Sequence, residues 1–171
     1  MSRKIPLAVG FANFSGEDFA LLASEDLAAI SPLFETTIVA TTQQIPRVDV
    51  IFIYARFAAS GALEQSSQTV GVRQIAHEAR SRVLISASAI PEDIAQKVMK
   101  FPGPATANLI FTLDRKRAAF ARFFCALFER MRRSEDMLYA WVELAPQAPM
   151  DANDNPELVL LPEAGAITFP P

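Results

Sequence analysis

Histidine and cysteine are scarce in this sequence, whose 171 residues hold one of each, His77 and Cys125. Histidine is the commonest metal ligand among the side chains that titrate near neutral pH, and cysteine is intrinsically very nucleophilic. One residue of each kind cannot form a two-histidine metal site or a thiolate cluster. They form a Cys–His dyad only if they meet in space. A single cysteine also excludes a disulfide within the chain, which favours a reducing compartment.

Both residues lie in segments that explain them structurally. His77 is in the middle of a predicted helix, where we expect a solvent-facing or half-buried side chain. It does not begin an H-E-x-x-H site, because the residue four positions on is Ser81. Cys125 lies in the apolar run Phe-Phe-Cys-Ala-Leu, where free cysteine packs as a small hydrophobe. The sequence therefore predicts no metal site and no cofactor.

Long hydrophobic runs are also missing, since no apolar stretch approaches the roughly 20 residues of a membrane span. The apolar start of the chain is interrupted by Pro6 and Asn13 and followed by Glu17 and Asp18, so it is typical of a strand rather than a signal peptide. The composition is 51% hydrophobic and 20% charged, as in a globular protein. We predict one cytoplasmic domain over residues 1–171, with a surface loop at 146–156 and no membrane contact.

Apolar runs alternate with helix-period segments along the chain. Strands are predicted at 6–14, 36–42, 49–57, 82–88 and 107–113, with a last strand pair at 157–161 and 166–169. Between them lie predicted helices, capped at Ser15 and Ser134 among other positions, the longest at 116–133. The run at 49–57 shows almost no polar alternation, as expected of a strand covered on both faces. The pattern predicts the α/β class: a three-layer doubly wound sandwich with a mostly parallel sheet of five to six strands and helices on both faces.

In such sheets ligands bind beyond the carboxyl ends of the strands. There the sequence offers three ligand-binding candidates, Tyr54, Arg56 and Arg115, because the two arginines are forks suited to a carboxylate or phosphate. It also offers weak catalytic candidates, which are the possible nucleophiles Ser15, Ser86 and Ser88 and the possible base Asp114. The turn after the first strand lacks G-x-G-x-x-G and is acidic, and G-x-S-x-G is absent, so nucleotide binding and a serine elbow are disfavoured.

Positive charge is concentrated in one window. Residues 115–133 hold seven cations and one anion, a net charge of +6, whereas the whole chain is −3. A solvated helix face explains this pattern, and so does a partner surface carried by Arg122, Arg130 and Arg133. Nucleic acid is disfavoured, because the aromatic residues lie on the opposite, apolar face of this helix and the whole chain is acidic.

The second half of the chain resembles the caspase-like clan, especially its CHAT-type members, over residues 107–169. The resemblance rests on Phe120-Ala-Arg-Phe123-Phe124 in a long helix, on Ala140-Trp141 in the next helix and on Leu158–Leu161 with Gly165. It implies a doubly wound sheet, with a His-Gly pair after strand three and a Cys after strand four. This sequence has Tyr54-Ala-Arg56 and Ser86-Ala-Ser88 there, so the Cys–His dyad is absent.

These observations leave three hypotheses. The first is a non-catalytic α/β domain, a pseudoenzyme of the caspase-like kind, that acts through protein–protein interaction, self-association or ligand sensing. The second is a hydrolase or transferase that uses a strand-end serine beside an arginine anion site. The third is a protein that binds a small anion or metabolite without chemistry.

Overall fold

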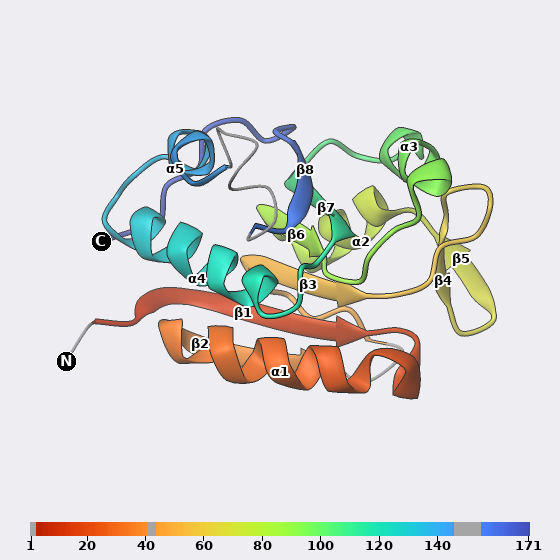
Figure 1. Ribbon diagram of the computed structural model, residues 1–171, viewed down its shortest axis with the longest axis horizontal. Coiled ribbons are helices and arrows are strands. Elements are labelled where there is room, and N and C mark those ends of the chain that lie inside the picture. Colours follow the sequence, from red (N-terminus) through yellow and green to blue (C-terminus); the bar gives the residue numbers. More distant parts are fainter. Residues whose placement is uncertain (1–2, 41–43, 146–154) are drawn as a thin grey trace.

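A six-stranded sheet forms the middle layer of the protein (Figure 1). The structure is a computed structural model and describes residues 3–40, 44–145 and 155–171. The strand order is β2-β1-β3-β6-β7-β8, with β8 antiparallel to β7 and all other neighbours parallel. The strands are β1 (Ile5–Asn13), β2 (Phe34–Ala40), β3 (Val50–Tyr54), β6 (Val83–Ser86), β7 (Asn108–Asp114) and β8 (Glu157–Leu161). The predicted α/β class and the mostly parallel sheet are confirmed.

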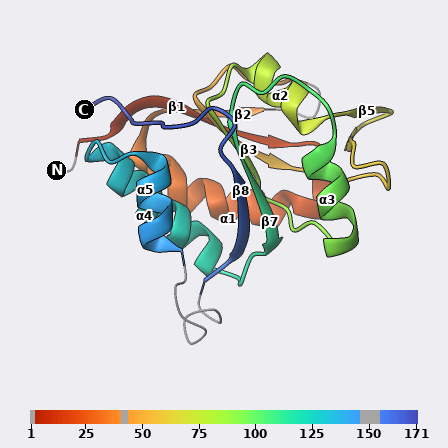
Figure 2. The same ribbon diagram turned by 90° about the horizontal axis from the view of Figure 1, so that it is seen from above.

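Helices cover both faces of the sheet (Figure 2). One face packs against α1 (Ala20–Ile30), α4 (Ala119–Arg132) and α5 (Met137–Leu144), and the other against α2 (Val72–Ala79) and α3 (Glu92–Lys100). Short 3-10 turns, η1 (Gly16–Phe19) and η2 (Ser31–Leu33), flank α1. Within the described part of the chain, no helix is long and apolar enough to cross a membrane.

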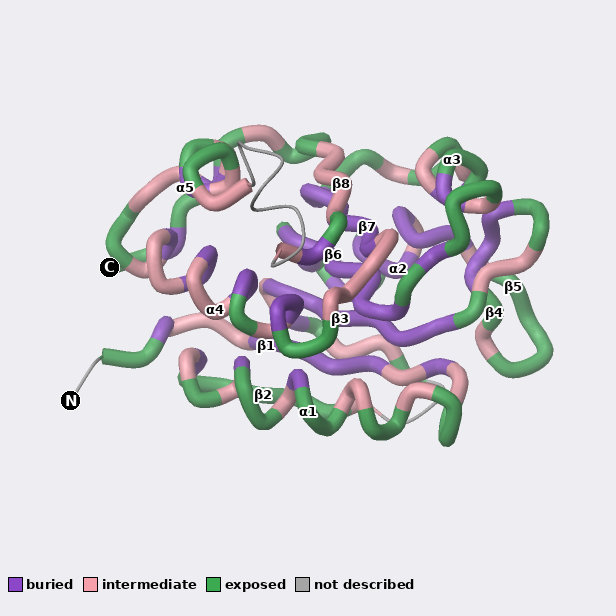
Figure 3. The backbone as a smooth tube through the Cα atoms, viewed as in Figure 1, coloured by how far each residue is buried: buried purple, intermediate pink, exposed green. Residues whose placement is uncertain are grey.

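The core includes the whole of β3, whose five residues are all buried (Figure 3). Successive side chains of a strand point to opposite faces, so Phe52 packs towards α4 and Ile51 and Ile53 towards α2. The Phe52 ring lies 5.5 Å from that of Phe124 in an edge-to-face arrangement. Burial on both faces explains why the sequence of this strand shows no polar alternation.

Three local predictions are wrong. The predicted loop at 58–67 contains most of an antiparallel hairpin, β4 (Leu63–Gln65) and β5 (Gln68–Val70). Residues 166–169 form no strand, because this segment bonds to α5 instead: the Met137 N–H donates to the Ile167 carbonyl at 2.8 Å. Asp136 rather than Ser134 caps α5, and its carboxylate accepts hydrogen bonds from the backbone N–H groups of Leu138 and Tyr139.

The predicted cap at Ser15 is also wrong. A 3-10 turn precedes α1, and the Ser15 hydroxyl accepts a hydrogen bond from the backbone N–H of Arg56 at 3.2 Å. Most of the predicted surface loop at 146–156 lies outside the described residues, which resume at Asn155.

Candidate functional site

The strand order reverses between β1 and β3, and this switch point is where an open α/β sheet usually binds ligands. Here the two chain segments beyond the strands bond to each other. The Phe14 N–H donates to the Tyr54 carbonyl at 2.9 Å, and Arg56 donates to Ser15 as described above. The Phe14 and Arg56 N–H groups and the Tyr54 carbonyl at the switch point are therefore already paired within the protein.

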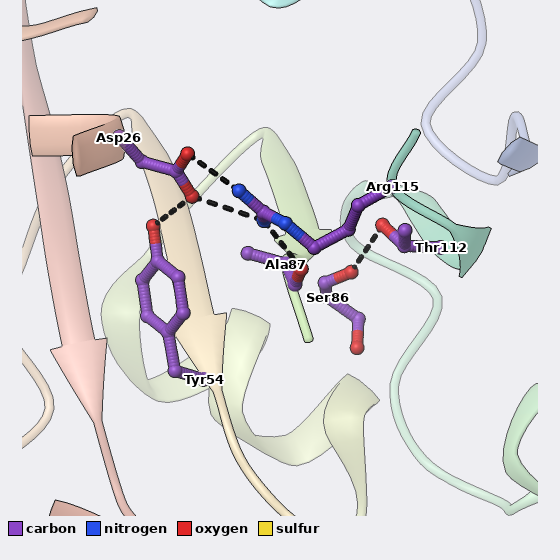
Figure 4. Close-up of polar contacts among 6 residues, drawn as sticks. All are labelled: Asp26, Tyr54, Ser86, Ala87, Thr112 and Arg115. Carbon is purple, nitrogen blue, oxygen red and sulfur yellow. Dashed lines mark hydrogen bonds and ion pairs between the residues drawn. The ribbon is translucent and has the colours of Figure 1, made fainter. Parts of the chain in front are cut away.

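A buried polar cluster of three residues lies beside this switch point (Figure 4). Asp26 comes from α1, Tyr54 from the end of β3, and Arg115 from the residue after β7. The Tyr54 hydroxyl donates to Asp26 Oδ2 at 2.7 Å, and the guanidinium of Arg115 donates to both carboxylate oxygens, at 2.7 and 3.1 Å. We call Asp26, Tyr54 and Arg115 the clamp, because it ties three separate elements together.

The polar groups of the clamp are hardly exposed to solvent and hydrogen-bond to one another. Asp26 is 1% exposed, Tyr54 is fully buried, and the Arg115 side chain is 11% exposed. Arg115 also donates to the Ala87 carbonyl at 2.7 Å and stacks on the Phe120 ring at 3.9 Å. Burial, followed by the nearby Asp26 carboxylate, raises the pKa of Tyr54 far above its ordinary value. Tyr54 is therefore a neutral hydrogen-bond donor at working pH.

The turn that follows Arg115 is strained. Lys116 and Arg117 both have positive φ, at 48° and 54°, which costs non-glycine residues about 1–2 kcal/mol each. Asp114 holds this turn, because its carboxylate accepts a hydrogen bond from the Lys116 N–H at 2.9 Å and pairs with the Lys116 ammonium at 3.2 Å. The Lys116 N–H, followed by its side chain, lowers the pKa of Asp114. This shift makes Asp114 a weaker general base.

None of the three candidate serines hydrogen-bonds to a basic side chain in the part of the chain that the structure describes. Ser88 is buried and bonds to both the N–H and the carbonyl of Ala55. Ser86 is fully buried on the α2–α3 side of the sheet, opposite the side of Tyr54, and its hydroxyl has no partner among the described residues. The Ser15 hydroxyl accepts a hydrogen bond from the backbone N–H of Arg56. Each serine hydroxyl is thus orphaned or bonded to the main chain.

The ligand-binding candidates separate in the structure. Tyr54 and Arg115 meet through Asp26, whereas Arg56 pairs with Asp18 at 2.7 Å on the surface, where both side chains are about half exposed. The Asp26 carboxylate already occupies the bidentate position on the Arg115 guanidinium that a bound anion would take. The predicted convergence of tyrosine and two arginines on one open rim is therefore not seen.

The basic window is partly neutralised by ion pairs. Arg115, Lys116, Arg130 and Arg132 pair with Asp26, Asp114, Glu135 and Glu129. Among the candidate partner residues, Arg130 is thus tied to Glu135 at 3.0 Å, while Arg122 and Arg133 are exposed and take part in none of these pairs. Arg133, the residue that follows the last turn of α4, lies eleven positions after Arg122, which places the two arginines on nearly the same side of the helix and about 16 Å apart along its axis.

The scarce residues occupy structural positions. His77 is exposed on α2, beside a polar groove of about 880 Å³ that Arg47, Arg80 and the β4–β5 turn also line. Cys125 is partly buried against the core and its thiol donates to the Ala29 carbonyl at 3.4 Å. Burial, followed by the charges of Glu129 and Asp26, raises the pKa of Cys125, so the thiolate is disfavoured. The described residues contain no group of three potential ligands that could hold a metal ion.

Asp26 is the residue that sequence reasoning missed, although a signal for it exists. The apolar stripe of α1 runs through Phe19, Leu22 and Ile30, and Asp26 falls in that stripe at helical spacing. A carboxylate at a core position requires a partner, and the partner lies 89 residues away in the sequence. Comparison with known proteins adds no assignment to this geometry, since no family model and no curated protein matches the chain.

Proposed function

We propose that this protein is a non-catalytic α/β domain that acts through protein–protein contact. The observation that carries the proposal is the clamp, which engages Tyr54 and Arg115, the strand-end residues beside the usual ligand position, in contacts within the protein. Catalysis would need an accessible nucleophile near a base, whereas the strand-end serines are buried or engaged by the main chain. Arg122 and Arg133 on α4 supply an exposed basic face for an acidic partner.

The resemblance to the caspase-like clan supports the same proposal. The positions where that clan carries its dyad are the ends of β3 and β6, and here they hold Tyr54-Ala-Arg56 and Ser86-Ala-Ser88. A degenerate member of such a clan would keep the sheet and lose the chemistry. The single cysteine supports a reducing, cytoplasmic location for this domain.

The basic face is tested by charge reversal at Arg122 and Arg133. The full chain, the double variant Arg122→Glu/Arg133→Glu and the control Arg47→Glu/Arg82→Glu are compared by crosslinking in cell extract followed by quantitative mass spectrometry. The control makes the same charge change at exposed arginines that lie before β3 and β6, outside α4. We expect wild type and control to recover the same acidic partner in similar amounts, and the recovery of that partner with the α4 variant to fall at least about tenfold.

The non-catalytic part of the proposal is tested separately with a serine-reactive fluorophosphonate. We expect no labelling of the folded protein. Labelling that disappears in Ser15→Ala, Ser86→Ala or Ser88→Ala would overturn the proposal in favour of the hydrolase hypothesis. Equal partner recovery by all three proteins in the crosslinking experiment would remove the basic face as the contact surface.

A further inference from the structure

The edge of the sheet at β2 is bare on both faces. In the described part of the chain β2 has β1 as its one neighbour in the sheet. Five consecutive residues of β2, from Glu35 to Val39, are exposed, with Val39 at 61% and Ile38 at 37% (Figure 3). Because successive side chains point to opposite faces, residues 35–39 of β2 are uncovered on both faces, whereas Phe34 at the start of the strand is buried against Phe128 of α4. The opposite edge differs, since four of the five residues of β8 are partly buried.

Lysine and proline, two of the usual protections of an edge strand, are missing from β2, and the register shift of the β1–β2 pair lies only at its start, between Ile5 and Ala8 of β1. Natural edge strands carry lysine, proline or bulges that prevent pairing with another chain. Residues Phe34–Ala40 contain no lysine, arginine or proline and one charged residue, Glu35, while three of the seven are β-branched threonine or isoleucine and one is valine. Among the described residues nothing hydrogen-bonds to the main chain on the outer side of β2, so that side can accept a further strand.

The neighbouring helix extends this edge with apolar surface. α1 exposes Leu21, which is 72% exposed, several small residues (Ala20, Ser24, Ala28 and Ala29) and one charged residue, Glu25. Apolar surface of this kind on a helix is normally covered. The bare strand and the bare helix lie together at one side of the molecule (Figure 1).

We propose that a second copy of this chain covers this edge, with β2 pairing antiparallel to β2 of the copy about a two-fold axis at Thr37. In that register Glu35 faces Val39 of the copy, Thr36 faces Ile38, and Thr37 faces its own equivalent. Thr–Thr and β-branched pairs stabilise antiparallel neighbours, whereas like charges directly opposite destabilise them. The two Glu35 carboxylates lie four residues apart along the seam, or about 14 Å.

Charge selects this occupant and this direction. A parallel pairing of two β2 strands would place the two Glu35 carboxylates side by side. The antiparallel pairing instead brings the end of the edge with Arg3 and Lys4 towards the end of the copy with Glu17, while the nearby Asp18 is already paired with Arg56. The two-fold axis also leaves both α1 helices on the same face of the continuous sheet, one on each side of the β2–β2 pair. Dimer formation would therefore bury the apolar surface of the strands and of the helices together. The sheet would then run through twelve strands.

The test uses light scattering coupled to size-exclusion chromatography on the full chain. We expect wild type to have the mass of two chains at about 100 µM and to dissociate on dilution. Thr37→Lys and Thr37→Glu each place like charges opposite each other at the axis, and each should weaken the dimer at least about tenfold. An equimolar mixture of the two variants should restore a dimer, because the introduced ammonium of one chain then faces the introduced carboxylate of the other.

The matched control is Thr69→Lys, which makes the same change on an exposed threonine of β5 and should leave the dimer intact. Thr37 is exposed, so the variants keep the fold, which circular dichroism verifies. A monomeric wild type overturns the proposal. Dimers that persist in both single variants, or a mixture that stays monomeric, overturn it as well. This interface is separate from the α4 face, so its failure leaves the proposed partner contact untouched.

Discussion

Replacing Asp26 with alanine probes the clamp directly. The substitution removes the acceptor of three hydrogen bonds, one from Tyr54 and two from Arg115, and leaves a guanidinium that is 11% exposed without its counter-ion. Removing one partner of a buried ion pair costs about 3–5 kcal/mol, because the other charge stays buried and uncompensated. The Tyr54 hydroxyl loses its acceptor in the same step. We expect the free energy of unfolding to fall by about 4 kcal/mol, a large fraction of the total for a domain of this size.

The measurement is equilibrium unfolding in urea, followed by circular dichroism, on wild type and three variants. Asp26→Ala should show the full loss. Tyr54→Phe leaves the ion pair in place and should cost only about 1 kcal/mol. The double variant Asp26→Leu/Arg115→Met replaces the pair by apolar groups and should recover most of the loss. The Ala87 carbonyl loses a donor in that variant, which keeps recovery incomplete.

Two results would refute this account of the clamp. A loss below about 1 kcal/mol in Asp26→Ala would show that the pair is effectively solvated. A double variant as unstable as Asp26→Ala would show that packing at these positions, rather than the uncompensated charge, sets the stability.

Three further predictions concern single side chains. The pKa of Tyr54 is raised in the folded state, so the stabilisation by its neutral hydroxyl is complete below the unfolded pKa of about 10 and is lost as the pH rises above that value. In urea titrations at a series of pH values, Tyr54→Phe should show a smaller alkaline decline of the free energy of unfolding than wild type. Ser86→Ala removes a buried hydroxyl that has no partner among the described residues, so the free energy of unfolding should stay unchanged or rise by up to about 2 kcal/mol. A clear loss of this free energy would reveal a partner for the hydroxyl. Gly61→Ala should destabilise the protein by at least about 2 kcal/mol, because φ is 90° and the new Cβ would lie 2.4 Å from the Lys97 carbonyl oxygen. The control is Gly16→Ala, where φ is 57° and the new Cβ meets no other atom, so this change should cost about 1 kcal/mol.

The elements that the sequence predicts well are those with strong local patterns. The unbroken apolar run of β3 and the apolar face of α4, from Phe120 to Met131, both lie in the core as expected. The β4–β5 hairpin was missed because its turn, Ser66-Ser67, lacks the glycine or asparagine that marks a two-residue turn. The segment 166–169 has the composition of a strand, but its pairing is decided by α5, which lies elsewhere in the sequence.

The candidate site was predicted in part for the same reason. Tyr54 and Arg115 could be placed at strand ends, because topology alone determines where parallel strands finish. Whether their side chains face a ligand depends on a carboxylate in a different helix, which no local pattern connects to them. A buried charge inside an apolar stripe, as at Asp26, is the signal that a long-range partner exists, although it does not say which residue is the partner.

The clamp has a consequence for how the chain folds. Asp26 and Arg115 are 89 residues apart in the sequence. Burying the Asp26 carboxylate is unfavourable until β7 has formed and placed the Arg115 guanidinium beside it. The first helix can form early, yet its docking onto the sheet awaits a strand made from the second half of the chain. Contacts of such sequence separation slow folding and are made late, so loss of the clamp should mainly accelerate unfolding. An N-terminal fragment that ends before β7 would carry an unmatched carboxylate on the face of α1 that has to be buried.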